Sequence, residues 1–100
     1  MTPQFLELAN NVAAISTGAA QQWNGGVATL AVQAGNFNGC TASLQTLGAD
    51  GLTWVAVGAS TTVTAAAAVT GIYLPAGPYR VVVSNAAPTA LYASLTASLN

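Results

Sequence analysis

Apolar and polar residues alternate with a period of two along much of the chain, a pattern typical of β-strands that bury one face. Three such runs follow one another between Trp23 and Ala59, at about residues 27–34, 40–47 and 53–57. The positions expected to face inward are Ala28, Leu30, Val32 and Ala34, then Cys40, Ala42 and Leu44, then Leu52, Trp54 and Ala56. The alternation predicts an antiparallel sheet with one buried face, and we expect all three runs to lie in it.

Two glycine-bearing dipeptides mark the turns around these runs. Asn38-Gly39 and Asp50-Gly51 are both flanked by alternating apolar residues. Asn, Asp and Gly tolerate the positive φ angles of tight hairpin turns, so this combination is the strongest short-range signal for a β-hairpin. We therefore expect a hairpin at each dipeptide, with the register of the neighbouring strands set by these turns.

The remainder of the chain continues the same alternation. It predicts short strands at residues 12–16, 71–74, 79–84 and 91–97, a turn at 75–78 and a loop at 61–69. The inward positions of the last two strands are Tyr79, Val81, Val83, Leu91, Ala93 and Leu95, whereas Tyr92 faces out. About seven to eight short strands separated by turn signals are typical of an antiparallel β-sandwich or a small jelly roll. The predicted fold is thus a single all-β domain over residues 12–100.

Residues 1–11 allow two interpretations. Pro3 keeps the residue before it out of the helical region, so the segment begins extended. Phe5, Leu6 and Leu8 are too apolar to be left in water. The segment is either a short first strand of the core or an arm that docks on a neighbouring molecule.

Charged side chains are almost absent. Glu7, Asp50 and Arg80 are the only ones, which is 3% of the chain, compared with about 25% in ordinary soluble domains. The formal net charge of −1 gives little repulsion between copies, and edge strands without charge lack their usual protection against pairing. We therefore expect sister subunits or a larger assembly to cover much of the surface. Polymerisation into fibrils through the edges is the less favoured outcome of the same composition.

The residues that carry most enzyme chemistry are missing. Without His, no Ser-His-Asp or Cys-His triad can form, and Glu7 and Asp50 lie in unrelated local contexts. No cluster of Cys, His or carboxylates predicts a metal site, and no glycine-rich phosphate loop predicts a cofactor. A single cation cannot supply the phosphate contacts of a nucleic-acid binder. The sequence therefore predicts no catalytic, cofactor-binding or metal-binding residue, and neither an enzyme nor a nucleic-acid-binding protein.

Targeting and redox signals are equally sparse. No window approaches about 20 consecutive apolar residues, as a membrane span requires, and Glu7 stands where a secretory signal would be basic. We expect a soluble protein made in a cytoplasm. The single Cys40 excludes an internal disulfide, and its place in a strand predicts a buried reduced thiol, with an intermolecular disulfide as the alternative.

Aromatic residues remain as candidates for recognition. Trp54 and Tyr79 are in phase with inward residues and are expected in the core. Trp23 beside a turn and Tyr92 among outward polar residues are expected at the surface, where they would stack on a sugar ring or contact a protein. Together with the apolar N-terminal residues and the single cation, they give a candidate interface of Phe5, Leu6, Leu8, Trp23, Arg80 and Tyr92.

Several segments resemble a recurrent pattern in small structural proteins of tailed bacteriophages. In that pattern a strand of the type TVxLQ leads into DGxTWVxVG, and LPAGxYRV precedes the final strands. The matching segments here are residues 41–45, 50–58 and 74–81, and the resemblance covers most of the chain from Trp23 onward. Cys40 and the Leu-Gly-Ala segment before Asp50 depart from the pattern, so we expect this hairpin to differ in detail.

The resemblance implies a non-enzymatic virion protein at the capsid surface, made in the host cytoplasm. Among such proteins it favours a capsid decoration (cement) protein, which bridges subunits of the major capsid protein and associates with itself, commonly as a homotrimer. Neutral, hydroxyl-rich faces suit this packing, because their contacts depend little on salt. A carbohydrate-binding or adhesin module, displayed as a head fibre or tail accessory protein, is the alternative.

Overall fold

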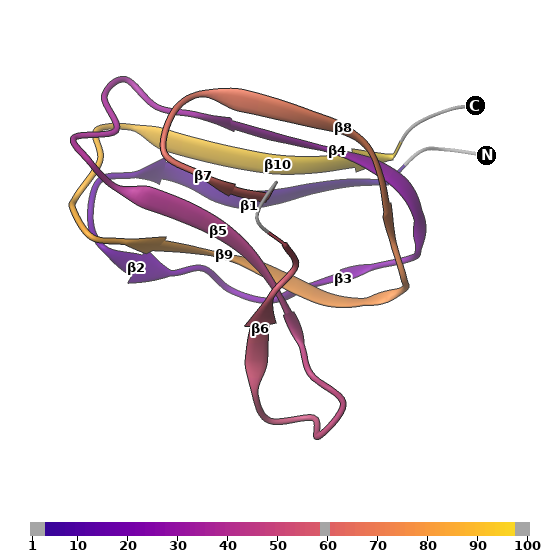
Figure 1. Cartoon of the computed structure of the whole chain (residues 1–100). Helices are drawn as coiled ribbons and strands as arrows, with labels where there is room; N and C mark the ends of the chain where they lie inside the picture. The colour runs from indigo at the N-terminus through magenta and orange to yellow at the C-terminus, as the bar shows by residue number, and fades with distance from the viewer. Residues whose placement is uncertain (1–3, 59–60, 98–100) are drawn as a thin grey trace.

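Two antiparallel β-sheets face each other across one hydrophobic core (Figure 1). The computed structural model describes residues 4–58 and 61–97. This part of the chain forms ten β-strands and no α-helix, as its alternating pattern and frequent β-branched residues favour. The predicted all-β sandwich is therefore confirmed, with more strands than expected.

The first sheet, called sheet A, has four strands in the order β1-β10-β4-β8. Its members are β1 (Phe5–Val12), β10 (Leu91–Ala97), β4 (Gly26–Gln33) and β8 (Ala67–Leu74). The period-two pattern buries alternate residues of β4 and β10, as predicted. These two central strands pair without a register shift, so the residues between the buried ones form a continuous outer face.

The second sheet, called sheet B, is built around two long neighbouring strands, β9 (Gly77–Ser84) and β5 (Thr41–Leu47). Short strands flank them. β2 (Ser16–Thr17) and β3 (Gln21–Trp23) pair with β9, whereas β6 (Trp54–Ala56) and β7 (Thr62–Val63) pair with β5. Leu44, Val81 and Val83 of the long strands are buried in the core.

The connections between strands define a jelly roll. β2 and β3 both pair with β9, and β6 and β7 both pair with β5. If each of these pairs is counted as one strand position, here called a lane, the ten strands occupy eight lanes. Numbered along the chain, the lanes lie in the order 1-8-3-6 in sheet A and 2-7-4-5 in sheet B. Every connection between successive lanes changes sheet except the one from β5 to β6. This is the arrangement of a double-sheet jelly roll.

Tyr79 secures the crossing from β8 to β9. Its ring is buried, and its hydroxyl donates a hydrogen bond of 2.7 Å to the carbonyl oxygen of Pro75. The geometry is similar to the tyrosine corner of other β-sandwiches. Burial raises the pKa of the Tyr79 hydroxyl above its ordinary value, and the predicted core position is confirmed.

The three alternating runs do not share one sheet, contrary to the prediction. β4 lies in sheet A, whereas β5 and β6 lie in sheet B. Asn38 and Gly39 have the expected positive φ angles of 54° and 85°. Their turn belongs to the crossing between the sheets, so the hairpin predicted there is wrong. There the Asn38 amide nitrogen donates hydrogen bonds to Ala87 and Thr89. A positive-φ turn fixes the local chain direction and leaves open whether the flanking strands pair.

A hairpin is confirmed at Asp50-Gly51, but Leu52 and Trp54 are not buried as predicted. Leu52 was expected to face inward and is 83% exposed, and Trp54 is half-buried where a core position was expected. The hairpin formed by β5, residues 48–53 and β6 reaches beyond the area where the two sheets overlap (Figure 1). No opposing sheet is there to cover it.

Two further predicted elements are wrong. Val12 ends β1 and the next strand begins only at Ser16, so residues 12–16 are not a strand. Residues 61–69, predicted as a loop, include β7 and the beginning of β8. Their β-branched residues find partners in β5 and β4, as in the pairs Val63↔Ala42 and Val69↔Leu30.

The N-terminal segment follows the strand interpretation in its described part. β1 pairs with β10 from Phe5↔Thr96 to Val12↔Leu91, so it runs across the predicted boundary after residue 11. Alternation buries Leu6 and leaves Phe5 exposed. Residues 1–3 of the expected arm lie outside the described residues.

Candidate interaction surfaces

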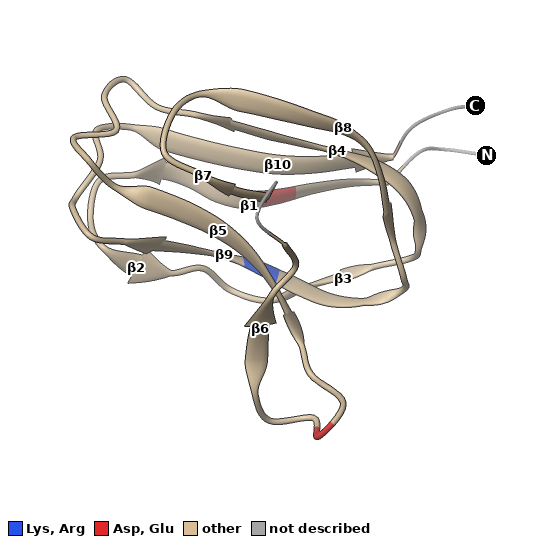
Figure 2. Cartoon of the chain, viewed as in Figure 1, with Lys and Arg blue, Asp and Glu red and all other residues tan. Residues whose placement is uncertain are grey.

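The three charged residues lie at separate places (Figure 2). Glu7 belongs to β1 in sheet A, Arg80 to β9 in sheet B, and Asp50 to the tip of the β5–β6 hairpin. The described residues contain no group of three or more His, Cys, Asp or Glu side chains that could hold a metal ion. In the same part of the chain, no helix is long and apolar enough to cross a membrane. Recognition by the described surface therefore rests mainly on neutral side chains.

Three of the predicted interface residues are core residues. Trp23 is 0% exposed, and Leu6 and Leu8 are 9% and 4% exposed. Trp23 ends β3, and although a turn follows it, the indole joins the core between the sheets. Its Nε1–H has no hydrogen-bond partner among the described residues. The predictions of Trp23 as a surface aromatic and of Leu6 and Leu8 as docking residues are therefore wrong, because all three side chains are buried in the core.

The other three predicted residues reach the surface but do not meet. Phe5 and Tyr92 lie on the outer face of sheet A, where they are 60% and 38% exposed. Arg80 lies on sheet B, half-buried, with its guanidinium carbon 4.2 Å from the centre of the Trp54 ring. Its Nε also donates a hydrogen bond of 3.0 Å to Gln45. The only cation of the chain is thus used to cover Trp54, a contact that stabilises the base of the hairpin.

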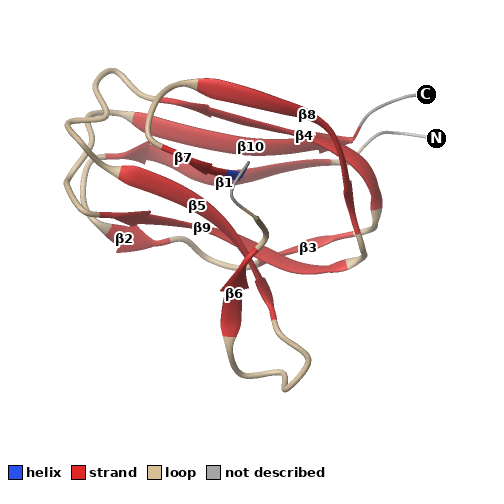
Figure 3. Cartoon of the chain, in the orientation of Figure 1, coloured by secondary structure: helices blue, strands red, loops and turns tan. Residues whose placement is uncertain are grey.

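The β5–β6 hairpin projects from the body of the sandwich (Figure 3). Beyond its last pair, Leu47↔Trp54, residues 48–53 form the tip. Leu52 at the tip is 83% exposed, and Val55 in β6 is 45% exposed. The hairpin therefore presents two aliphatic side chains to solvent on a protruding element.

A groove of about 540 Å³ lies between this hairpin and the β8–β9 connection. Val55 and Val57 line it from the hairpin side, and Leu74, Pro75 and Pro78 line it from the connection. Tyr73 at its margin is 69% exposed. We call this groove, together with the exposed hairpin residues Leu52 and Val55, the hairpin surface.

A carboxylate fixes the tip of the hairpin. Asp50 Oδ1 accepts hydrogen bonds of 2.9 Å from the backbone N–H groups of Thr53 and Leu52, and Oδ2 accepts one of 2.7 Å from the Thr53 hydroxyl. These donors favour the ionised carboxylate, so they lower the pKa of Asp50 to about 2. Leu52 is therefore held outward by a defined turn.

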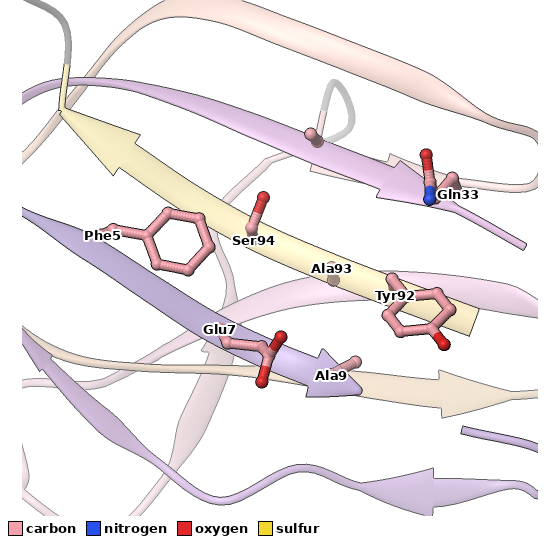
Figure 4. A pocket seen from close by; sticks show the side chains of 8 residues that line it. Phe5, Glu7, Ala9, Gln33, Tyr92, Ala93 and Ser94 are labelled. Atoms are coloured by element: carbon pink, nitrogen blue, oxygen red, sulfur yellow. The ribbon is translucent and has the colours of Figure 1, made fainter. Parts of the chain in front are cut away.

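A shallow depression of about 260 Å³ lies on the outer face of sheet A (Figure 4). Three strands line it through Phe5, Glu7, Ala9, Ala31, Gln33, Tyr92, Ala93 and Ser94. Strand register explains the set, because Glu7 lies opposite Ser94 and Gln33 lies opposite Tyr92. Figure 4 shows the two aromatic rings towards opposite ends, with Glu7 and Ser94 between them.

The sequence pattern identified only part of these surfaces. Phe5 and Tyr92 were among the predicted interface residues, but Glu7, Gln33 and Ser94 were missed. These residues come together through the register of strands that are distant along the chain, which no local pattern reveals. Leu52 was missed for a different reason, because it alternates in phase with Trp54 and was therefore predicted to face inward. Its position directly after the Asp50-Gly51 turn was the signal that could have indicated an exposed hairpin tip.

Comparisons with known proteins add no assignment to these surfaces. The chain matched no protein-family model, no curated protein and no solved structure. Proposals about function therefore rest on the described surfaces, the composition and the resemblance of the sequence motifs.

Proposed function

We propose that this chain is a non-enzymatic virion structural protein of a tailed bacteriophage, and within that class a capsid decoration protein that bridges subunits of the major capsid protein. The hairpin surface is the observation that carries the proposal. Its Leu52 side chain is 83% exposed and is held there by the Asp50 turn. Covering one such side chain is worth about 1.5–3 kcal/mol, which favours association with a partner.

The chemistry of the hairpin surface favours a protein partner. Leu52 projects from the tip of the hairpin, beside a groove lined mainly by apolar side chains, and exposed apolar patches mark interaction sites on soluble proteins. Leu52, Val55 and Tyr73 together supply aliphatic and aromatic contacts, and the one charge at the tip, Asp50, is already hydrogen-bonded within the turn. Such a surface binds another protein face by shape and apolar burial.

Two of the three resembling segments contribute to this surface. Residues 50–58 form the tip and β6, and residues 74–81 form the connection that lines the groove and the beginning of β9. The third segment, residues 41–45, lies in β5 and does not line the groove. Jelly rolls also occur in viral capsid proteins, although a fold alone does not define a function.

The charge distribution supports dense assembly. Each copy carries a formal net charge of −1, and the three charged residues are dispersed. Neighbouring copies on a lattice would repel one another very little. We therefore propose that the partners are the major capsid protein and sister copies of this chain, with a homotrimer as the expected assembly.

Substitution of Leu52 tests the proposal. Phage particles that lack this protein are incubated with purified wild-type or Leu52→Asp protein, and the bound fraction is measured by sedimentation. We expect Leu52→Asp to weaken binding at least about tenfold, because a charge replaces the apolar contact.

A matched control separates this effect from a general loss of apolar surface. Ile15 is 59% exposed and lies in the connection between β1 and β2, so Ile15→Asp should bind as the wild type does. Circular dichroism shows whether each variant is folded. Unchanged particle binding by folded Leu52→Asp would contradict the proposal.

A further inference from the structure

The depression on sheet A combines exposed aromatic rings with unused polar groups. Phe5 and Tyr92 expose 60% and 38% of their surface, and Glu7, Gln33 and Ser94 add a carboxylate, an amide and a hydroxyl. Among the described residues, none of these three polar side chains takes part in a hydrogen bond, since the bond from Gln21 to Glu7 reaches the backbone oxygen. Polar groups that converge in a concave site without internal partners are available to a ligand.

The spacing of the two rings sets the size of that ligand. Phe5 lies opposite Thr96, four residues from Tyr92 on the same strand, which corresponds to about 13 Å along the sheet. This distance exceeds a single pyranose ring. A ligand that contacts both aromatic rings is therefore an extended chain of linked units. Glu7 and Ser94, which lie between the rings, would contact the middle of that chain.

From this arrangement we infer that the depression is a binding site for a neutral oligosaccharide. The C–H face of a pyranose ring is apolar and stacks on an aromatic ring, whereas its equatorial hydroxyls bind in-plane acceptors and donors. Phe5 and Tyr92 supply the stacking surfaces. Glu7 accepts hydrogen bonds from sugar hydroxyls, and Gln33 and Ser94 both donate and accept.

Charge selects against acidic sugars. Glu7 is the one charged residue that lines the depression, and the only cationic side chain, Arg80, is held on sheet B over Trp54. A uronic acid or sialic acid would bring its carboxylate towards Glu7 without a cation to balance it. The site therefore discriminates in favour of uncharged hexoses and N-acetylhexosamines. This inference is independent of particle binding through the hairpin surface.

Titration with defined oligosaccharides tests the inference. The folded full chain is titrated by two-dimensional NMR with cellohexaose, maltohexaose, mannohexaose and chitohexaose, and with hexagalacturonate as the acidic probe. We expect at least one neutral hexasaccharide to shift the amide signals of Phe5, Glu7, Tyr92 and Ser94, and hexagalacturonate to shift none. Tyr92→Ala and Phe5→Ala should each weaken the binding about tenfold, which corresponds to ~1.4 kcal/mol.

Two further variants make the outcome decisive. Tyr73→Ala removes an exposed tyrosine of the same sheet that does not line the depression, and it should bind the sugar as the wild type does. Glu7→Gln should reduce the discrimination against hexagalacturonate. The inference is overturned if no neutral probe shifts these signals, or if Tyr92→Ala and Tyr73→Ala have equal effects. Loss of particle binding in Phe5→Ala without any sugar binding would also overturn it, because the face would then contact protein.

Discussion

The Tyr79 hydroxyl links Tyr79 to Pro75 at the crossing from β8 to β9. Pro75 follows the last residue of β8, in sheet A, and Tyr79 belongs to β9, in sheet B. The 2.7 Å hydrogen bond to the Pro75 carbonyl closes this crossing, and Thr46 of β5 donates another bond to the carbonyl of Pro78. The buried Tyr79 hydroxyl needs such a partner, because an unmade hydrogen bond in the interior costs the desolvation of the group.

Removing this hydroxyl should measurably destabilise the protein. Tyr79→Phe keeps the buried ring and deletes the donor, and we expect the free energy of unfolding to fall by about 1–2 kcal/mol. Urea unfolding gives this value from the shift of the midpoint at unchanged slope. Tyr92→Phe is the matched control, since Tyr92 is at the surface, and it should change stability by less than about 0.5 kcal/mol. Equal midpoints for Tyr79→Phe and the wild type would contradict this role.

At the scale of single elements, the β5–β6 hairpin depends on the charge state of Asp50. The carboxylate accepts its hydrogen bonds from Thr53 and Leu52, and these lower the pKa of Asp50 from 3.8 to about 2. A lowered pKa in the folded state means that the ionised form stabilises the turn. This contribution is present above about pH 4 and is lost as the pH falls through about 2.

The amide signals of the tip should report this titration. We expect the backbone N–H resonances of Leu52 and Thr53 to shift with a midpoint near pH 2, whereas an unbonded aspartate would titrate nearer to 3.8. Two-dimensional NMR spectra recorded across the acid range provide the measurement. Asp50→Asn should abolish the step. A midpoint at the ordinary value would show that the turn does not hold the carboxylate as described.

The edge strands of sheet A show a second property of the elements. The pairing of β1 shifts register twice, and the pairing of β8 with β4 shifts once, between Ala28↔Ile72 and Leu30↔Val69. Gly71 takes up the extra residue of β8 with φ 70°, a conformation that side-chain-bearing residues rarely adopt. Such bulges twist an edge and hinder pairing with another chain. Apart from the single charge of Glu7 on β1, these edges are thus protected by backbone geometry.

The sequence pattern predicted the class of fold and most of the buried positions, because alternation is a local property. It predicted the core positions of Leu30, Leu95 and Tyr79, and the buried Cys40. It did not predict which strands pair, since the jelly roll changes sheet at nearly every connection and turn residues such as Asn38 carry no information on this. The clustering of Glu7 with Ser94 depends on that pairing and was out of reach for the same reason.

For the molecule as a whole, stability should depend little on pH near neutrality and fall at alkaline pH. Burial raises the pKa of the Cys40 thiol above 9.0 and that of the Tyr79 hydroxyl above 10.0. The folded state therefore holds these protons more tightly than the unfolded chain does. The stabilisation is complete below about pH 9 and is lost as the pH rises further, where the unfolded chain ionises first.

Thermal unfolding between pH 5 and 11 measures this dependence. We expect a nearly constant Tm between about pH 5 and 8, because the chain has no His, followed by a decline above about pH 9. Cys40→Ala should move the onset of the decline towards pH 10, since Tyr79 then remains as the main contributor. A Tm that rises above pH 9, or changes steeply between pH 5 and 8, would contradict the assigned burial.

The central proposal concerns the whole molecule as a repeated subunit on the surface of a phage particle. An exposed apolar hairpin surface and a net charge of −1 suit many copies placed side by side on a shell. Quantitative mass spectrometry of purified phage particles, with the major capsid protein as the internal reference, measures the number of copies directly. The proposal predicts a ratio near one or a simple fraction of it, as expected for a protein that covers the lattice. Absence of the chain from the particles, or its presence only in trace amounts, would contradict the assignment as a decoration protein.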